Sequence, residues 1–187
     1  MIRLAVFVSG GGSNLQALID HFRSSDVLQI AVVISNRDDA GGLERARKEG
    51  IPAVVANGDE IIAVLDEHRV DLIALAGYLK LIPVEVIRRY DGRILNIHPA
   101  LLPAFGGKGM YGHHVHEAVI ASGATESGAT VHWVTEEYDR GAIIAQRKVP
   151  VLPNDTPDAL AARVLDVEHQ LYPEVVESIA NKLCQQH

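Results

Sequence analysis

The chain has 187 residues, of which 48% are hydrophobic, and a formal net charge of −7. We expect residues 1–187 to form a single domain with a sizeable core. The negative charge argues against a nucleic-acid-binding face. Every apolar stretch is shorter than the roughly 18 residues that cross a bilayer, and Met1 leads directly into a strand pattern without a signal-peptide cleavage site. We therefore expect a cytoplasmic protein that binds neither nucleic acid nor membrane.

In the first half of the chain, apolar strand patterns alternate with helical patterns. The expected strands cover residues 2–8, 28–34, 53–56, 71–76 and 94–96, and the expected helices cover 15–22, 43–48, 61–68 and a segment opened by Pro83. Continuous apolar strands between amphipathic helices are typical of a parallel sheet covered on both faces. The pattern predicts an α/β fold with a Rossmann-like, open, mostly parallel twisted sheet.

The second half of the chain is less regular. Residues 104–114 are rich in glycine and lack periodicity, so we expect a long loop there. Two strand-like runs, 130–134 and 143–151, flank an acidic turn and are expected to add an antiparallel extension to the sheet. A long helix is predicted to close the chain, capped by Thr156 and kinked or restarted at Pro173. The single cysteine, Cys184, excludes an internal disulfide and is interpreted as an incidental thiol.

A glycine-rich turn, GGGSN at residues 10–14, joins the first expected strand to the first helix. Backbone amides at such a turn, together with the helix dipole, suit a phosphate group. The spacing differs from the dinucleotide-binding glycine pattern, and the lysine of a nucleotide-binding P-loop is missing. A tight turn with a capping box formed by Ser13 and Gln16 explains the local pattern equally well.

The strongest chemical signal is Asn96 and His98 at the end of the fifth expected strand, with Asp139 in the later acidic turn. The spacing of the first two places both side chains on one face of an extended segment. Asn96 can donate a hydrogen bond to a developing oxyanion, and a protonated His98 can donate a second one while serving as a proton source. Asp139 would raise the pKa of His98 toward working pH. Taken alone, His98 is more often a structural histidine that caps a turn.

Three segments carry a resemblance to a known family: SGGGSNLQ (residues 9–16), NIHPALLP (96–103), and GATVHWV (128–134) followed by YDRG (138–141). With Asn36, Arg37 and LERAR (43–47), they extend over nearly the whole chain. The sequence resembles the phosphoribosylglycinamide formyltransferases, the folate-dependent family of purine synthesis. The middle and third segments are typical of formyltransferases in general, and the first favours the glycinamide enzymes.

The resemblance implies the formyltransferase fold and transfer of the formyl group of 10-formyltetrahydrofolate, a co-substrate, to the amine of N1-(5-phosphoribosyl)glycinamide. It implies a catalytic triad of Asn96, His98 and Asp139. It places the ribotide phosphate at Gly12, Ser13 and Asn14, and a further ribotide contact at Glu168. The implied folate site comprises Leu79, Lys80, Leu81, Ile82, Asn96, Thr135, Glu136, Glu137, Tyr138 and Asp139.

Several of these residues also have ordinary structural interpretations. Leu79 and Leu81 are about equally explained as core, and a helical glutamate such as Glu168 is usually solvated. The histidines at 113, 114 and 116 are interpreted as loop or dimer-surface residues, and no metal is required. Two positions depart from the family pattern. Lys80 stands where an arginine is common, and the folate-binding arginine has no counterpart near residues 57–59.

Other functions remain open at this stage. A methionyl-tRNA formyltransferase would share the middle and third segments, but it should add a basic tRNA-binding domain. A formyltetrahydrofolate hydrolase would share the same core and normally adds a regulatory domain. A non-catalytic ribotide-binding protein would use the glycine-rich turn and would need no Asn96, His98 and Asp139. The sequence leaves monomer and homodimer equally open.

Overall fold

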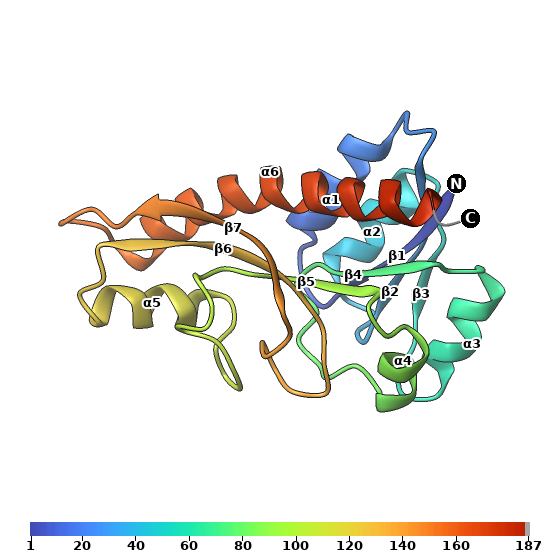
Figure 1. Ribbon diagram of the computed structural model, residues 1–187, viewed down its shortest axis with the longest axis horizontal. Coiled ribbons are helices and arrows are strands. Elements are labelled where there is room, and N and C mark those ends of the chain that lie inside the picture. The colour runs from blue at the N-terminus through green and yellow to red at the C-terminus, as the bar shows by residue number, and fades with distance from the viewer. Residues whose placement is uncertain (186–187) are drawn as a thin grey trace.

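The computed structural model describes residues 1–185; Gln186 and His187, the last two residues of the expected domain, lie outside the described residues. Its strands are β1 (Ile2–Val8), β2 (Leu28–Ser35), β3 (Ala53–Val55), β4 (Leu72–Leu75), β5 (Ile94–His98), β6 (Glu126–Trp133) and β7 (Ile143–Pro150). They form one sheet in the order β3-β2-β1-β4-β5-β6-β7 (Figure 1). The pairings from β3 to β5 are parallel, and β6 and β7 add antiparallel pairings. The predicted open, mostly parallel α/β sheet is confirmed.

Within the described residues, six helices accompany the sheet: α1 (Ser13–Phe22), α2 (Gly41–Lys48), α3 (Glu60–Glu67), α4 (Val84–Arg89), α5 (His113–Ala121) and α6 (Pro157–Cys184). The side chains of β1 alternate between two core clusters. Leu4 and Val6 pack with α1, α2 and α6, whereas Ala5 and Phe7 pack with α3 and α4. Because successive strand residues point to opposite faces, both faces of β1 are covered. This explains why its sequence is apolar without interruption.

Helix α6 runs across one face of the sheet (Figure 1). Thr156 caps its start as predicted, since its side chain accepts a hydrogen bond from the Ala159 N–H at 3.2 Å. The expected restart at Pro173 is wrong, because a single helix continues through this residue. Tyr172, fully buried, donates to the carbonyl of Leu75 at 2.9 Å. Packing of this kind next to the proline offsets the roughly 3 kcal/mol that a proline costs inside a helix.

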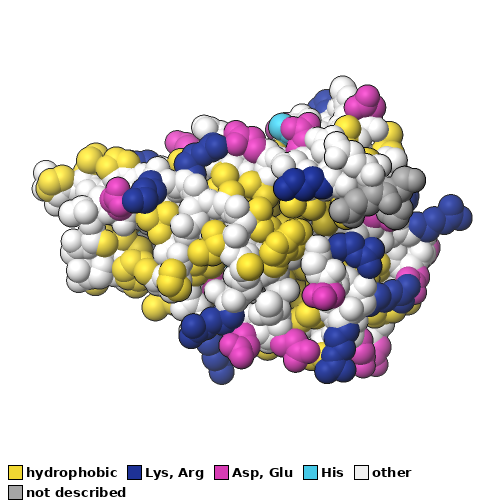
Figure 2. All heavy atoms as spheres, in the orientation of Figure 1, with side chains coloured by type: hydrophobic (Ala, Val, Ile, Leu, Met, Phe, Trp, Pro, Cys, Tyr) yellow, Lys and Arg dark blue, Asp and Glu magenta, His cyan; other side chains and the backbone are white. Residues whose placement is uncertain are grey.

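The expected loop at 104–114 ends earlier than predicted, because α5 begins at His113. Gly107, Gly109 and Gly112 all have positive φ, which weakened the helical pattern ahead of this helix. Within residues 1–185, no helix is both long and apolar enough to span a bilayer. Figure 2 shows that apolar side chains nevertheless reach the surface near the middle of one face, while charged side chains lie mostly along its edges.

Candidate active site

A cavity of about 770 Å³ opens where β1, β4 and β5 end. Its wall includes Ser13 and Asn14 after β1, Leu75 at the end of β4, and Asn96 and His98 at the end of β5. In an open α/β sheet, ligands bind beyond the carboxyl ends of the strands. The cavity therefore occupies the position at which this fold class binds its ligands.

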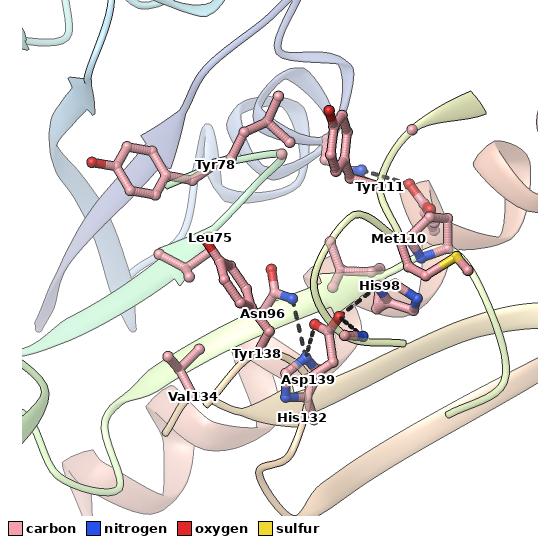
Figure 3. Close-up of a pocket in the computed structure, with 18 of the residues that line it drawn as sticks. Leu75, Tyr78, Asn96, His98, Met110, Tyr111, His132, Val134, Tyr138 and Asp139 are labelled. Carbon is pink, nitrogen blue, oxygen red and sulfur yellow. Dashed lines mark hydrogen bonds and ion pairs between the residues drawn. The ribbon is translucent and has the colours of Figure 1, made fainter. Parts of the chain in front are cut away.

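The structure brings the predicted trio together (Figure 3). Asn96 is half-buried, and the His98 side chain is buried, with 3% of the residue exposed. Asp139 lies between β6 and β7, with one carboxylate oxygen 3.5 Å from Nδ1 of His98. That oxygen also accepts a hydrogen bond from the N–H of Gly107 at 2.9 Å. The aspartate therefore contacts both β5, through His98, and the glycine-rich segment, through Gly107.

The turn that carries Asp139 depends on close backbone contacts. Asp139 has a φ of 53°, in the left-handed region that aspartate tolerates better than most residues. Two residues later, a Cβ on Gly141 would lie 1.6 Å from the carbonyl oxygen of Trp133. Glycine is therefore required there, which accounts for the Asp-Arg-Gly sequence at 139–141.

Burial of His98 favours the neutral form of its imidazole. Its Nε2 lies 2.7 Å from the carbonyl oxygen of Phe105, so this nitrogen carries the proton, and the lone pair on Nδ1 faces Asp139. Burial lowers the His98 pKa, and this effect outweighs the charge of Asp139 and the Phe105 hydrogen bond, which raise it. Asp139 therefore acts on the His98 pKa in the expected direction, but burial lowers this pKa by more than the aspartate raises it.

The pKa of Asp139 is lowered. Burial raises it, but the neighbouring rings of His132 and His98 and the N–H of Gly107 together outweigh burial and lower it. The carboxylate is therefore charged at neutral pH. A charged carboxylate 3.5 Å from Nδ1 is placed to stabilise an imidazolium once a proton reaches His98.

His132 belongs to the same cluster, although the sequence interpretation gave it no role. It is buried on β6, directly opposite Asn96 in the antiparallel pair. Its Nδ1 lies 2.8 Å from the carbonyl oxygen of Trp133, so in the neutral ring Nε2 is free to accept from Nδ2 of Asn96 at 3.0 Å. His132 thereby orients the Asn96 amide, whose second N–H remains available. Its sequence signals were an imidazole between the apolar residues of β6 and its place in the GATVHWV segment at 128–134.

The predicted ribotide residues lie on one side of the cavity. Gly12 has a φ of 73° and is the N-cap of α1, where it makes no side-chain cap, so the capping-box alternative is wrong. A Cβ on Gly12 would lie 2.7 Å from Cα of Gly42, which requires glycine at this turn. Ser13 and Asn14 follow it in the cavity wall, together with Glu168 from α6.

Glu168 is buried, so the alternative of a solvated helical glutamate is wrong. It accepts a hydrogen bond from Nδ2 of Asn14 at 2.7 Å, although the two residues are 154 positions apart. Burial raises the pKa of Glu168 to about 7, while the hydrogen bond from Asn14 lowers it. The carboxyl can therefore act as donor or acceptor near neutral pH, which suits the recognition of hydroxyl groups.

All but one of the predicted folate residues also line the cavity. The lining residues among them are Leu79, Lys80, Leu81, Ile82, Asn96, Thr135, Glu137, Tyr138 and Asp139. Leu79 and Leu81 are 50% and 52% exposed, so the core alternative is wrong for both. Glu136 lies 3.6 Å from Arg88 instead of in the wall. Lys80 donates to Oδ1 of Asn57 at 3.4 Å, which places this lysine beside the segment that lacks the expected arginine.

Of the three neighbouring histidines, only His116 departs from the predicted surface position. They lie on α5, and only His113 and His114 are exposed, each paired with Glu117. His116 is buried in the cavity wall, where burial, followed by the charges of His113 and His98, lowers its pKa. Among residues 1–185 there is no group of three His, Cys, Asp or Glu side chains arranged to hold a metal.

Comparison with known proteins relates the chain to formyltransferases in each case. The family model described as "Formyl transferase" matches residues 2–176. The chain is 50% identical to the chloroplastic phosphoribosylglycinamide formyltransferase of Vigna unguiculata over 96% of its length, and it spans 61% of that relative. It is 43% identical to the Haemophilus influenzae phosphoribosylglycinamide formyltransferase, covering 95% of this chain and 86% of the relative.

Solved structures agree with the sequence comparison. The crystal structure of phosphoribosylglycinamide formyltransferase from Anaplasma phagocytophilum superimposes with a TM-score of 0.90 at 40% identity. The match covers 97% of this chain and 87% of that chain. It therefore includes all the strands and helices that surround the cavity.

Proposed function

The chain belongs to the formyl transferase family, and we propose that it transfers the formyl group of 10-formyltetrahydrofolate to the amine of N1-(5-phosphoribosyl)glycinamide, a step of purine synthesis. One observation carries the proposal. The cluster of Asn96, His98 and Asp139 lies in the lining of a single cavity, together with polar residues that suit the ribotide and exposed apolar residues that suit a flat folate.

In the proposed reaction, the ribotide amine attacks the formyl carbon, and the formyl oxygen gains negative charge. The free amide N–H of Asn96 stabilises this oxyanion. The new carbon–nitrogen bond then replaces the bond from the formyl carbon to N10 of the folate. Over the whole reaction, one proton is transferred from the attacking amine to N10 of the folate.

His98 is the proposed carrier of that proton. It is neutral at rest, so it can accept the proton that the amine releases. Asp139 then stabilises the imidazolium until the proton passes to N10. In this order of steps, His98 accepts a proton before it donates one. A histidine that is protonated at the outset would donate first, and burial of the imidazole is the reason for the difference.

The two substrates are assigned to the two walls. Backbone amides at the start of α1, near Gly12, Ser13 and Asn14, suit the phosphate, and Glu168 suits the ribose hydroxyls. The exposed leucines and Tyr138 suit the pterin and the adjoining ring of 10-formyltetrahydrofolate. We infer that the co-substrate supplies the one-carbon group without a metal.

Formyl transfer to N1-(5-phosphoribosyl)glycinamide, with water and methionyl-tRNA as competing acceptors, tests the proposal. We expect the ribotide to be the preferred acceptor. Preferential release of formate would support a hydrolase, preferential formylation of methionyl-tRNA would support the tRNA enzyme, and ribotide binding without turnover would leave a binding protein. Phosphate density away from residues 12–14 in a ribotide-soaked crystal would contradict the assigned anchor.

We further infer a cytoplasmic protein that acts as a monomer or homodimer on small-molecule substrates. The Vigna unguiculata relative is named as chloroplastic, so the compartment needs a direct test. Cell fractionation with organelle markers decides the compartment, and sedimentation at micromolar concentration decides the oligomeric state.

A further inference from the structure

The hydroxyl of Ser9 has two hydrogen-bond partners on different strand connections. Ser9 directly follows β1 and is 5% exposed. Its Oγ accepts a hydrogen bond from the backbone N–H of Leu79 at 2.9 Å and donates to Oδ1 of Asn36. A buried hydroxyl that uses both its donor and its acceptor capacity holds its partners in a defined geometry.

These partners lie at the ends of neighbouring strands. Asn36 follows β2 and Leu79 lies beyond β4, while β1 runs between those two strands in the sheet. The backbone N–H of Ser9 also donates to the carbonyl of Gly77 at 3.1 Å. A single serine therefore joins three adjacent strand ends at the edge of the sheet where the cavity opens.

The connection also joins the two proposed substrate walls. The glycine-rich turn begins immediately after Ser9 and is held from α2, because Arg45 donates to the carbonyl of Gly11 at 2.7 Å. Leu79 opens the apolar wall on the other side. The Leu79 side chain is half exposed, so core packing does little to fix this backbone, whereas Ile82 anchors the far end of the segment in the core.

We propose that Ser9 is a positioning residue that holds residues 79–82 in a fixed position relative to the glycine-rich turn, so that the folate wall is formed before the formyl donor, 10-formyltetrahydrofolate, binds. This inference rests on the proposed function of the cavity. Without the hydroxyl, the Leu79 N–H loses its partner and the segment must order itself when the donor binds. That cost falls on donor affinity rather than on the chemical step.

Ser9→Ala tests the proposal in the full chain. We expect the KM for 10-formyltetrahydrofolate to rise about fivefold to tenfold, the size of effect expected for one lost hydrogen bond. The kcat should stay within about twofold, because Asn96, His98 and Asp139 are unchanged. Calorimetry with 5,8-dideazafolate, which carries no formyl group, should show a matching rise in Kd.

Ser35→Ala is the matched control. Ser35 is a buried serine at the end of the adjacent strand β2, and its hydroxyl accepts the N–H of Arg37 at 3.1 Å, away from the cavity wall. Both variants should lose similar thermal stability, but only Ser9→Ala should weaken donor binding. Ser9→Thr, which keeps a hydroxyl, should recover most of the affinity.

Asn36→Ala is a second variant that keeps the serine and removes the acceptor that orients it. If Ser9→Ala does not fold, this variant decides the question through a smaller rise in the same KM. If Ser9→Ala is folded and active but its KM for 10-formyltetrahydrofolate is unchanged, the inference is wrong and the proposed function still stands. The same holds for an unchanged KM in Asn36→Ala when Ser9→Ala does not fold. Equal KM changes in Ser9→Ala and Ser35→Ala also overturn it. A wild-type protein that transfers no formyl group overturns the proposed function and, with it, this inference.

Discussion

The two walls of the cavity are built in opposite ways. On the ribotide side, Asn14 and Glu168 are buried and hydrogen-bonded to each other. On the folate side, Leu79 and Leu81 are about half exposed. Burying a carboxyl group costs stability, whereas leaving a leucine exposed costs little in the folded state and becomes favourable when a ligand covers it. The first wall is therefore expected to influence stability and binding together, and the second to influence binding almost alone.

The proposed catalytic trio lines the same cavity, and removing its imidazole should have the largest effect. His98→Ala is expected to lower kcat by about 10² to 10⁴-fold, the range typical of a lost general acid or base. The KM for the ribotide should change little, because its proposed anchor lies at the start of α1 and on α6. Steady-state kinetics and ribotide calorimetry measure the two effects. Wild-type turnover in this variant would show that His98 is not the group that carries the proton.

Glu168→Gln should sharpen the contrast by stabilising the protein while weakening ribotide binding. The folded pKa of about 7 exceeds the ordinary 4.5, so the folded state binds this proton more tightly than the unfolded state does. The resulting stability is fully present below pH 4.5 and is lost as pH rises through 7. The wild type therefore carries a penalty of about 3 kcal/mol at pH 8.5 that glutamine avoids.

Urea unfolding of the wild type and Glu168→Gln at pH 5 and pH 8.5 measures this difference. The two proteins should be close in stability at pH 5, and the variant should be the more stable at pH 8.5. Asp166→Asn removes a carboxylate from the same helix outside the cavity wall and serves as the control. An equal gain in the control, or a loss for Glu168→Gln at pH 8.5, would contradict the interpretation.

Asp139→Asn tests the electrostatic role of the third residue. Removing the carboxylate takes away a charge that raises the His98 pKa, so that pKa should fall further. Activity requires neutral imidazole and is lost as pH drops through this pKa, so the acidic limb of the pH profile should move to lower pH. We expect kcat to fall about 10-fold to 100-fold, because the imidazolium loses its counter-charge.

The control for Asp139→Asn is Glu136→Gln, an acidic residue of the same turn that pairs with Arg88 outside the cavity. Its pH profile should match that of the wild type. NMR titration of the His98 ring in both variants gives the pKa directly. An unchanged His98 pKa in Asp139→Asn would show that the 3.5 Å contact carries no useful charge interaction.

The parallel part of the fold was predictable because burial on both faces makes its strands continuously apolar. The predicted range 2–8 coincides with β1, and the boundaries of 28–34 and 71–76 are close to those of β2 and β4. Helix α5 was missed because glycines with positive φ precede it and its first turn is rich in histidine. Local propensity is weak in such a segment, and tertiary packing decides its structure.

The same distinction between local pattern and long-range packing applies to the candidate site. Asn96 and His98 share one strand, so their proximity follows from spacing alone. The role of His132 depends on the register between β5 and β6, which places it opposite Asn96. The burial of Glu168 depends on α6 packing beside the start of α1, where Asn14 meets it. Register and helix packing are long-range properties, so neither could be derived from the local pattern.

The smallest expected effect concerns the exposed folate wall and compares two similar surface residues. Leu79→Ser should raise the donor KM about fivefold, because the half of this side chain that is still exposed contributes about 1 kcal/mol when a ligand covers it. Its melting temperature should stay close to that of the wild type. Val55→Ser, at a 42% exposed position on β3, should change neither quantity. Donor titrations and thermal unfolding measure both variants; a marked loss of stability in Leu79→Ser would show that this wall, like the ribotide wall, is part of the folded core.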